Sequence, residues 1–134
     1  MGTDIHIHME YRGRKKKQYR YGGQMYGERL YGVFEVFGGV RLRGKPLIRP
    51  RGLPGDVTNV VLQSYKDWKP ACHHASWLTT AELKDCLDEA QKRLIAVKES
   101  ADNGWLRPYE RIYEYMMDYE KVGEPCRIVF WFDN

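Results

Sequence analysis

Strict alternation of apolar and polar residues near the start of the chain constrains the fold more than any other feature. Residues 4–11 read DIHIHMEY. Successive side chains of a β-strand point to opposite faces, so this period of two predicts a strand. Its core face then carries Ile5, Ile7, Met9 and Tyr11. The other face carries a row of polar side chains, namely Asp4, His6, His8 and Glu10.

A second alternating segment lies near the other end of the chain, where Ile128, Phe130 and Phe132 occupy every second position. An isolated strand is unstable, so we expect the two segments to pair in one sheet. Residues 18–21 predict a returning strand after a basic turn over residues 13–16, and Gly22-Gly23 are expected to end it. Residues 70–77 are interpreted as a loop.

Apolar residues at helical spacing predict four helices between the two strong strands. The first has Leu30, Val33, Phe34 and Phe37, and the second begins at a capping Asp56. The third begins at Thr79, which forms a capping box with Glu82, continues through Val97 and is expected to end at Asn103-Gly104. The fourth has Pro108 in its first turn. The sequence therefore predicts one domain over residues 1–134, an α+β fold with a small, mainly antiparallel sheet packed on about four helices.

The charge is distributed unevenly along the chain. Residues 1–54 hold 12 Lys/Arg against 4 Asp/Glu, although the net charge of the whole chain is only +4. An electropositive half favours an anionic partner such as a nucleotide, a phosphate or nucleic acid. No apolar run is long enough to span a membrane. The three cysteines have no metal-type spacing, which favours reduced thiols and a cytoplasmic protein.

Three segments carry candidate site residues. The polar row of the first strand could hold a metal ion, because side chains at i and i+2 share one face. A loop rich in proline and arginine over residues 41–54 suits phosphate recognition through guanidinium forks. The segment around residues 73–77 places His73, Ser76 and Trp77 on an expected loop, where binding groups concentrate.

Five short segments also match a sequence pattern in order along nearly the whole chain. They are the opening Met1 to His6 with Glu10 following, Gly39-Val40-Arg41, residues 50–54 (PRGLP), residues 73–78 (HxxSWL) and residues 127–134 (RIVFWFDN). Together they resemble an uncharacterised family of bacteriophage and bacterial proteins. The resemblance implies a phage-type intracellular protein and brings no activity. The family pattern includes Asp4, His6, Glu10, Arg51 and His73 but varies at His8, which favours a composite pocket over a two-histidine metal motif.

These features predict binding without catalysis or a cofactor. The expected ligand is a small anion, a nucleotide or a nucleotide-derived defence signal that the protein sequesters in the host cytoplasm, with a homo-oligomer allowed. Phosphates are expected to contact Arg41, Arg49, Arg51 and Arg127. His6, His73 and Ser76 supply hydrogen bonds, and Trp77 or Trp131 stacks on a base. Asp4 and Glu10 orient the histidines or accept from ribose hydroxyls.

Two alternatives remain open. The first is a metal-dependent hydrolase or phosphoesterase in which zinc or manganese is held by Asp4, His6, His8 and His73, with Glu10 as general base. The second is a nucleic-acid-binding or protein-binding module that acts through the basic turn.

Overall fold

The computed structural model describes residues 2–98 and 104–134, except for the side chains of residues 97 and 98. A four-stranded antiparallel sheet has the strand order β2-β1-β4-β3, so the two strongly alternating segments are its central strands. The elements follow in the order β1 (Asp4–Arg12), β2 (Tyr19–Met25), α1 (Tyr31–Gly38), α2 (Asn59–Trp68), β3 (Cys72–Thr79), α3 (Thr80–Lys98), α4 (Arg107–Glu120) and β4 (Cys126–Asp133).

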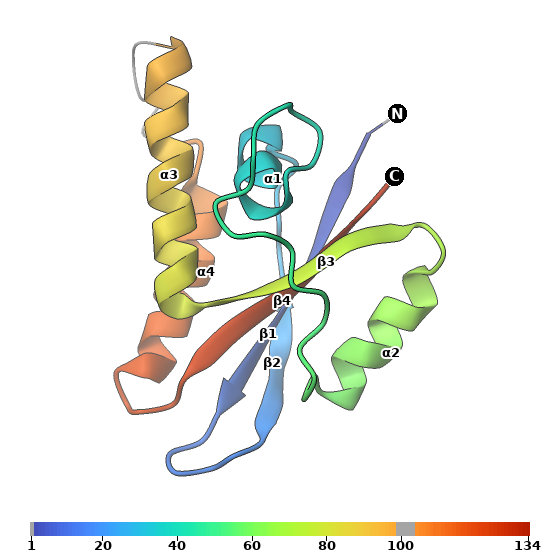
Figure 1. The fold of residues 1–134 in the computed structure, drawn as a ribbon. Helices are drawn as coiled ribbons and strands as arrows, with labels where there is room; N and C mark the ends of the chain where they lie inside the picture. The colour runs from blue at the N-terminus through green and yellow to red at the C-terminus, as the bar shows by residue number, and fades with distance from the viewer. Residues whose placement is uncertain (1, 99–103) are drawn as a thin grey trace.

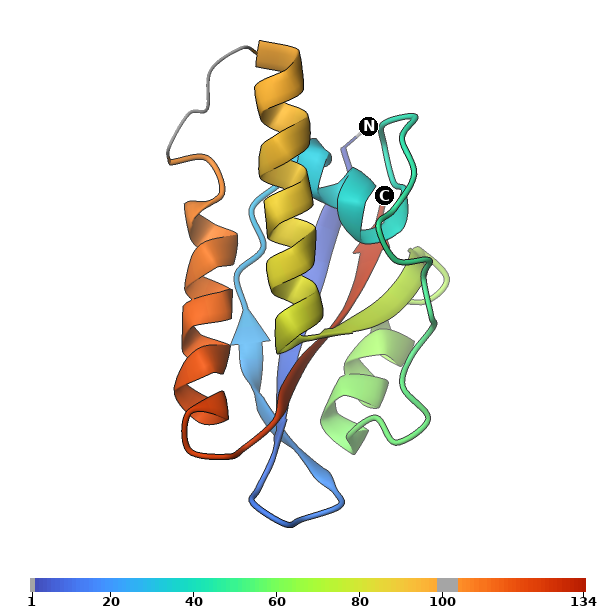
Figure 2. The ribbon, with the colours of Figure 1, turned by 60° about the vertical axis from the view of Figure 1, so that its left-hand side comes forward.

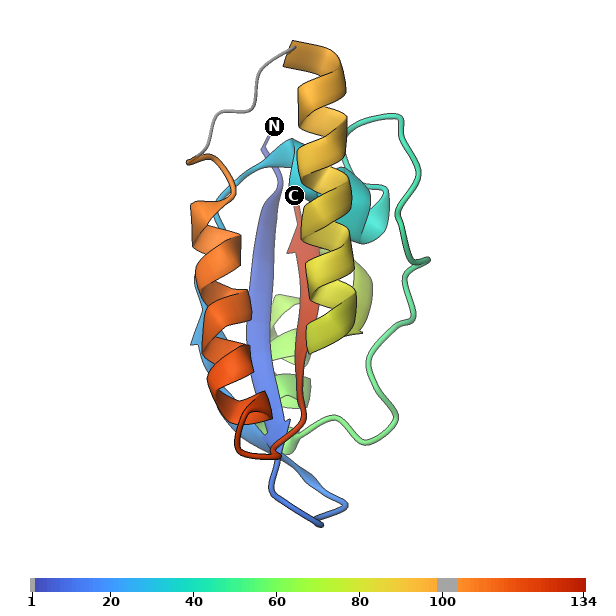
Figure 3. The same ribbon diagram turned by 90° about the vertical axis from the view of Figure 1, so that its left-hand side faces the viewer.

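The sheet separates two unequal helical layers. Helices α1, α3 and α4 cover one face, while α2 alone lies against the other (Figure 1). Figure 3 looks through α3 and α4 onto the sheet, with α2 behind it. The hairpin between β1 and β2 projects beyond the body of the protein at the end opposite the two termini. The predicted α+β fold is confirmed, as is the pairing of the first and last strands.

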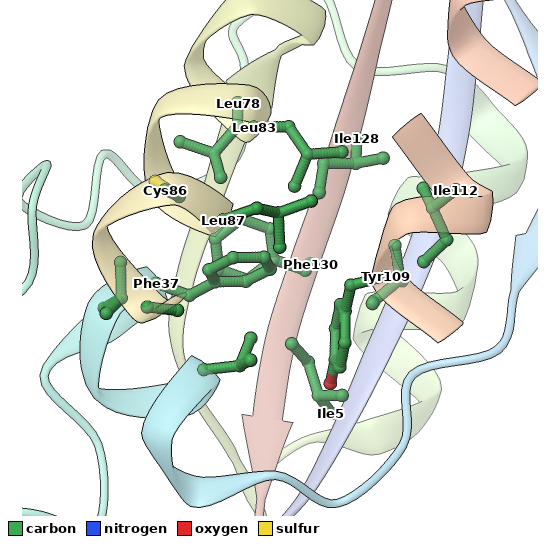
Figure 4. Close-up of a cluster of buried hydrophobic side chains, with 14 of the residues drawn as sticks. Ile5, Phe37, Leu78, Leu83, Cys86, Leu87, Tyr109, Ile112, Ile128 and Phe130 are labelled. Carbon is green, nitrogen blue, oxygen red and sulfur yellow. The ribbon is translucent and has the colours of Figure 1, made fainter. Parts of the chain in front are cut away.

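The main hydrophobic core lies between the sheet and the three-helix layer. It contains the apolar faces that alternation predicted in β1 and β4, including Ile7 and Phe130, both fully buried. Figure 4 shows Phe37 of α1 beside Phe130, with their ring centroids 5.2 Å apart. Tyr109 of α4 meets Phe37 edge to face. Burial of each such side chain stabilises the fold by about 1.5–3 kcal/mol, so this core dominates its stability.

The third helix begins as its sequence predicts. The backbone N–H of Thr79 donates to the Glu82 carboxylate at 2.9 Å, and the N–H of Glu82 donates to Thr79 Oγ1 at 3.2 Å. These two bonds form the reciprocal capping box. Pro108 lies in the first turn of α4, also as expected. The expected end of the third helix at Asn103-Gly104 falls at the edge of the undescribed residues, and the Val97 side chain lies outside the described part.

The prediction of a loop over residues 70–77 is wrong, because Cys72–Thr79 form the edge strand β3. Its register shifts between His73 and Ser76, where His74 has a φ of 55°. A β-bulge of this kind adds a residue and reverses the alternation of faces, so the sequence shows no period of two. In the described residues β3 therefore lies between the second and third helices, instead of all four helices following in succession.

Two element boundaries also differ from the prediction. Strand β2 continues through Gly22 and Gly23 to Met25, with a register shift opposite Met9 and Glu10. Helix α2 begins later than expected, because Thr58 is its N-cap and accepts from the N–H of Val61. Asp56 lies before the helix, and its carboxylate is engaged elsewhere.

Candidate functional site

The polar row of β1 faces α2. Cross-strand pairing in the sheet places His6 beside Trp131 and Glu10 beside Arg127, all on the side opposite the main core. His8 is only 4% exposed and Glu10 is fully buried. His8 and Glu10 are therefore covered by α2 and the segment that leads into it, whereas Asp4 is exposed.

Glu10 is the centre of a buried charge network. Its carboxylate accepts from Arg127 Nε at 2.7 Å and from the backbone N–H of Thr58 at 2.8 Å. Arg127 Nη1 in turn donates to the Asp56 carboxylate at 2.8 Å. One carboxylate thus binds a guanidinium of the central strand and the N-cap of α2. This arrangement fixes α2 on the sheet, and Arg127 has both sides of its fork engaged.

The two histidines of the row contact different neighbours. His6 Nε2 is paired with the Asp133 carboxylate, and the His6 ring packs 4.1 Å from the Trp68 ring. His8 Nδ1 lies 3.0 Å from the Tyr21 hydroxyl. Burial lowers the pKa of His8 below its usual value, the nearby His6 lowers it further, and Glu10 opposes both. His8 is therefore kept neutral near pH 7, as a hydrogen-bonding core histidine.

Trp131 is not available to stack on a ligand. The structure buries it completely beneath α2, where its ring packs against His8 and Tyr65. The interpretation of Trp131 as a base-stacking residue is therefore wrong for this conformation. Its indole Nε1 is buried without a hydrogen-bond partner among the described residues.

Arg51 uses its guanidinium fork inside the protein. It forms a bidentate pair with the Glu82 carboxylate, and its guanidinium lies 4.3 Å from the centroid of the Trp77 ring. The hydrogen bond from Arg51 lowers the pKa of Glu82, so the pair is ionised near neutral pH. The backbone N–H of Arg51 donates to Ser76 Oγ at 3.0 Å. Arg51, Ser76 and Trp77 thus do lie together, and their contacts join the arginine loop to β3 and α3.

The loop also protects an edge of the sheet. Gly52 N–H donates to the Ala75 carbonyl at 2.8 Å, and Arg51 Nη1 donates to the Trp77 carbonyl at 3.3 Å. Unpaired edge groups are templates for unwanted strand pairing. The arginine–proline segment therefore has a structural role along the outer edge of β3.

His6 and His73 lie on opposite faces of the sheet. His6 is paired with Trp131 on the α2 side, whereas His73 is paired with Phe132, whose side chain belongs to the main core. His73 contacts His74, with 2.7 Å between their Nδ1 atoms, and its Nε2 contacts Asn134. Since β4 separates the two imidazoles, the structure does not form the composite pocket that the sequence predicted.

The remaining predicted residues are also dispersed. Asp4 pairs with Arg29 at the surface, with side chains about half exposed. Arg41 and Arg49 are exposed and have no ion pair among the described residues, although the Arg41 guanidinium lies 4.7 Å from the Tyr31 ring centroid. Within residues 2–98 and 104–134, no group of three or more His, Cys, Asp or Glu side chains is arranged to hold a metal ion.

The projecting hairpin is the other candidate site. Residues 11–27 contain no Asp or Glu and carry six cations, listed as Arg12, Arg14, Lys15, Lys16, Lys17 and Arg20. Lys15, Lys16, Lys17 and Arg20 are exposed, and none of the six forms an ion pair with a described carboxylate. Arg14 instead donates to the Val122 carbonyl. The tip is therefore a concentrated, uncompensated positive surface.

Tyr19 at the base of the hairpin is held between two guanidinium groups. The Arg127 guanidinium carbon lies 3.6 Å from the Tyr19 ring centroid, and that of Arg12 lies 5.6 Å from it. These cation–π contacts join the hairpin to the buried charge network of Glu10. The ribbon is thus anchored at its base while its tip reaches into solvent (Figure 2).

No family model matches the chain, and neither curated proteins nor solved structures yield a significant match. None of the helices in the described ranges is long and apolar enough to cross a membrane.

Sequence reasoning missed the partners that engage the polar row. Thr58, Asp56 and Ser64 all come from α2 or its approach, and they contact Glu10, Arg127 and His8, respectively. One feature of the sequence pointed to these partners. Asp56 and Thr58 both lie just before an amphipathic helix, although the sequence did not show that this helix packs on the polar row. The free backbone N–H groups at the start of a helix can donate to carboxylates of a polar row when the helix packs on that face.

Proposed function

We propose that this protein binds nucleic acid through the β1–β2 hairpin. The observation that carries the proposal is the run of six cations without a carboxylate on a projecting two-stranded ribbon. The electrostatic attraction of Lys and Arg to phosphates supplies most of the affinity of sequence-independent binding. A structural role for the run is less well supported, because apart from Arg12 and Arg14 the cations have no partner among the described residues.

The shape of the hairpin favours duplex DNA within this class. The major groove of B-form DNA admits a two-stranded β-ribbon, whereas the major groove of A-form RNA is too narrow for side chains to read. The ribbon is anchored at its base by Tyr19 between Arg12 and Arg127. A fixed ribbon loses less conformational entropy on binding than a mobile tail of the same charge.

The small-ligand proposal from the sequence receives less support. It placed Arg51, Arg127 and Glu10 against a ligand, with Trp77 or Trp131 stacking on a base. Arg51, Arg127 and Glu10 make internal contacts in this structure, and Trp131 is buried. Of the four arginines that the sequence proposed as phosphate contacts, Arg41 and Arg49 are exposed, so an anion can approach them. The phage-type origin, the cytoplasmic location and the homo-oligomer stay predictions.

The test is the salt dependence of binding to a fluorescently labelled 20-base-pair DNA duplex, measured by anisotropy. The variant replaces Lys15, Lys16 and Lys17 with Ala. A matched control replaces Lys66, Lys84 and Lys92, three exposed lysines elsewhere, and so makes the same change in net charge. Each phosphate contact adds about 0.9 to the slope of log affinity against log salt, so the hairpin variant is expected to lower the slope by about 2–3.

The control variant should bind with nearly the affinity of the unmodified protein. Equal losses in the two variants would show that only net charge matters and would contradict a hairpin site. Absence of duplex binding at 50 mM salt would reject the proposal. An RNA duplex of equal length provides the comparison that tests the preference for B-form DNA.

A further inference from the structure

A cleft opens on the opposite layer from α2, between α1, α3 and the residues that lead into α4. Its volume is about 430 Å³. Figure 2 shows α1 lying beside α3 above the sheet. Small-molecule sites typically occupy about 300–1,000 Å³, so the cleft is large enough for a compact ligand.

The walls of the cleft are mainly apolar. Its lining includes Leu30, Leu42, Leu94 and Trp105. Leu42 is 47% exposed. These side chains form an apolar surface in the folded protein, against which the apolar part of a ligand can pack.

Trp105 is held in place as a wall. Its Nε1 donates to Gln91 Oε1 at 3.2 Å. Its ring also packs closely on Gly32, where an added Cβ would lie 3.2 Å from the indole Cη2. Because the indole is fixed on two sides, it can contact a ligand ring without first losing rotational freedom.

Two arginines, Arg29 and Arg93, also line the cleft, and they differ in how strongly carboxylates of the protein already bind their guanidinium groups. Arg93 is held by Glu35 and Glu89, each at 2.9 Å, so two carboxylates compensate its charge. Arg29 forms an ion pair with Asp4 at 2.8 Å in which both side chains are about half exposed, and it also interacts with Tyr31. Exposed ion pairs contribute little free energy. Arg29 can therefore exchange Asp4 for the anionic group of a ligand at small cost.

We propose that the cleft binds a small amphipathic anion. An aromatic or branched aliphatic body lies against Trp105 and the leucines, and a carboxylate or phosphate faces Arg29. The site lies apart from the hairpin and does not depend on nucleic-acid binding.

The probes are phenylacetate, phenyl phosphate and the neutral phenylacetamide, titrated against the full chain and followed by two-dimensional ¹H–¹⁵N NMR. The Trp105 indole N–H signal is expected to shift saturably with both anions, at millimolar Kd. The buried Trp131 indole signal serves as an internal reference that should not move. Phenylacetamide should bind about 10-fold more weakly, because it makes no charge-assisted bond with Arg29.

Two pairs of variants separate the cleft from general surface binding. Leu42→Glu should weaken phenylacetate binding at least about 10-fold by removing apolar area and repelling the anion, whereas Leu47→Glu on the same loop should not. Leu47 is 43% exposed and does not line the cleft. Arg29→Gln should abolish the preference for anions. Arg107→Gln, which breaks an equally exposed ion pair with Glu114, should leave it unchanged.

A saturable Trp105 shift that depends on Leu42 and Arg29 supports the proposal. The proposal is overturned if Trp105 does not respond to either anion at 20 times the expected Kd, that is, at tens of millimolar. It is equally overturned if the two control variants lose as much affinity as their partners.

Discussion

Glu10 and Arg127 are directly opposed across the two central strands, and they form an ion pair from which solvent is excluded. The Glu10 side chain is fully buried and the Arg127 side chain is 5% exposed, with 2.7 Å between Oε1 and Nε. Taking two charges out of water is costly, so such a pair contributes to stability only when its remaining hydrogen bonds are satisfied. Here the N–H of Thr58 and the carboxylate of Asp56 satisfy them.

The first prediction concerns Glu10→Gln. This variant keeps the shape of the side chain but leaves the buried Arg127 charge poorly compensated. Removing one partner of a buried pair costs about 3–5 kcal/mol, and we expect a loss at the lower end because Asp56 remains. Urea unfolding followed by circular dichroism measures the free energy of unfolding. Glu114→Gln, in the exposed pair with Arg107, should cost less than about 1 kcal/mol. Similar losses in both variants would contradict a special role for the buried pair.

The second prediction concerns pH. The pKa of His8 is lowered in the folded protein, mainly by burial, so the unfolded chain binds this proton more readily. The stabilising contribution is therefore complete above the unfolded pKa of about 6.5 and is lost as the pH falls toward the folded pKa. His8→Asn should flatten the stability profile below pH 6.5 relative to the unmodified protein. An NMR titration that gives His8 a pKa at or above 6.5 would refute the assignment.

The third prediction concerns Arg51. Arg51→Ala removes the bidentate contact with Glu82 and the stacking on Trp77, so we expect a loss of about 1.5–3 kcal/mol in the free energy of unfolding. Arg51→Lys should recover only part of this, since an ammonium group cannot present a planar fork. The control is Arg49→Ala on the same loop, which should change stability by less than about 0.5 kcal/mol. If thermal and urea unfolding give the same loss of stability for Arg51→Ala and Arg49→Ala, the guanidinium fork of Arg51 has no structural role.

The fourth prediction separates backbone strain from side-chain contact. Gly52 has a φ of +77°, and an added Cβ would meet no heavy atom within 4 Å. Gly52→Ala should therefore cost about 1 kcal/mol through backbone conformation alone. Gly55→Ala, also in open space but without a positive φ, should be neutral or slightly stabilising. The two variants are compared by their urea midpoints, and a neutral Gly52→Ala would contradict the left-handed conformation.

Local rules were sufficient for much of the fold. Alternation in β1 and β4 identified their core faces correctly, because each strand has one face on the large hydrophobic core. The Thr79–Glu82 capping box identified the start of α3, since both partners lie within one turn of the chain. In each case the information was contained in a few neighbouring residues.

The candidate site depended on information that no local pattern contains. His6, His8 and Glu10 were correctly placed on one face, but the sequence could not show that α2 covers that face. Arg51 and Glu82 lie 31 positions apart, and their pairing converts an expected phosphate fork into an internal contact. The bulge at His74 similarly disguised β3, because it breaks the alternation by which a strand is recognised.

The central position of β1 and β4 also determines when the sheet can form. Asp4 is paired with Asp133, so the middle of the sheet joins segments separated by nearly the whole sequence. During synthesis β1 is made before the four helices, whereas its main partner β4 is made after them. Until then the apolar face of β1 has only β2 and the early helices to cover it. Contacts of such long sequence separation slow folding, so the sheet can close only after β4 becomes available to pair with β1.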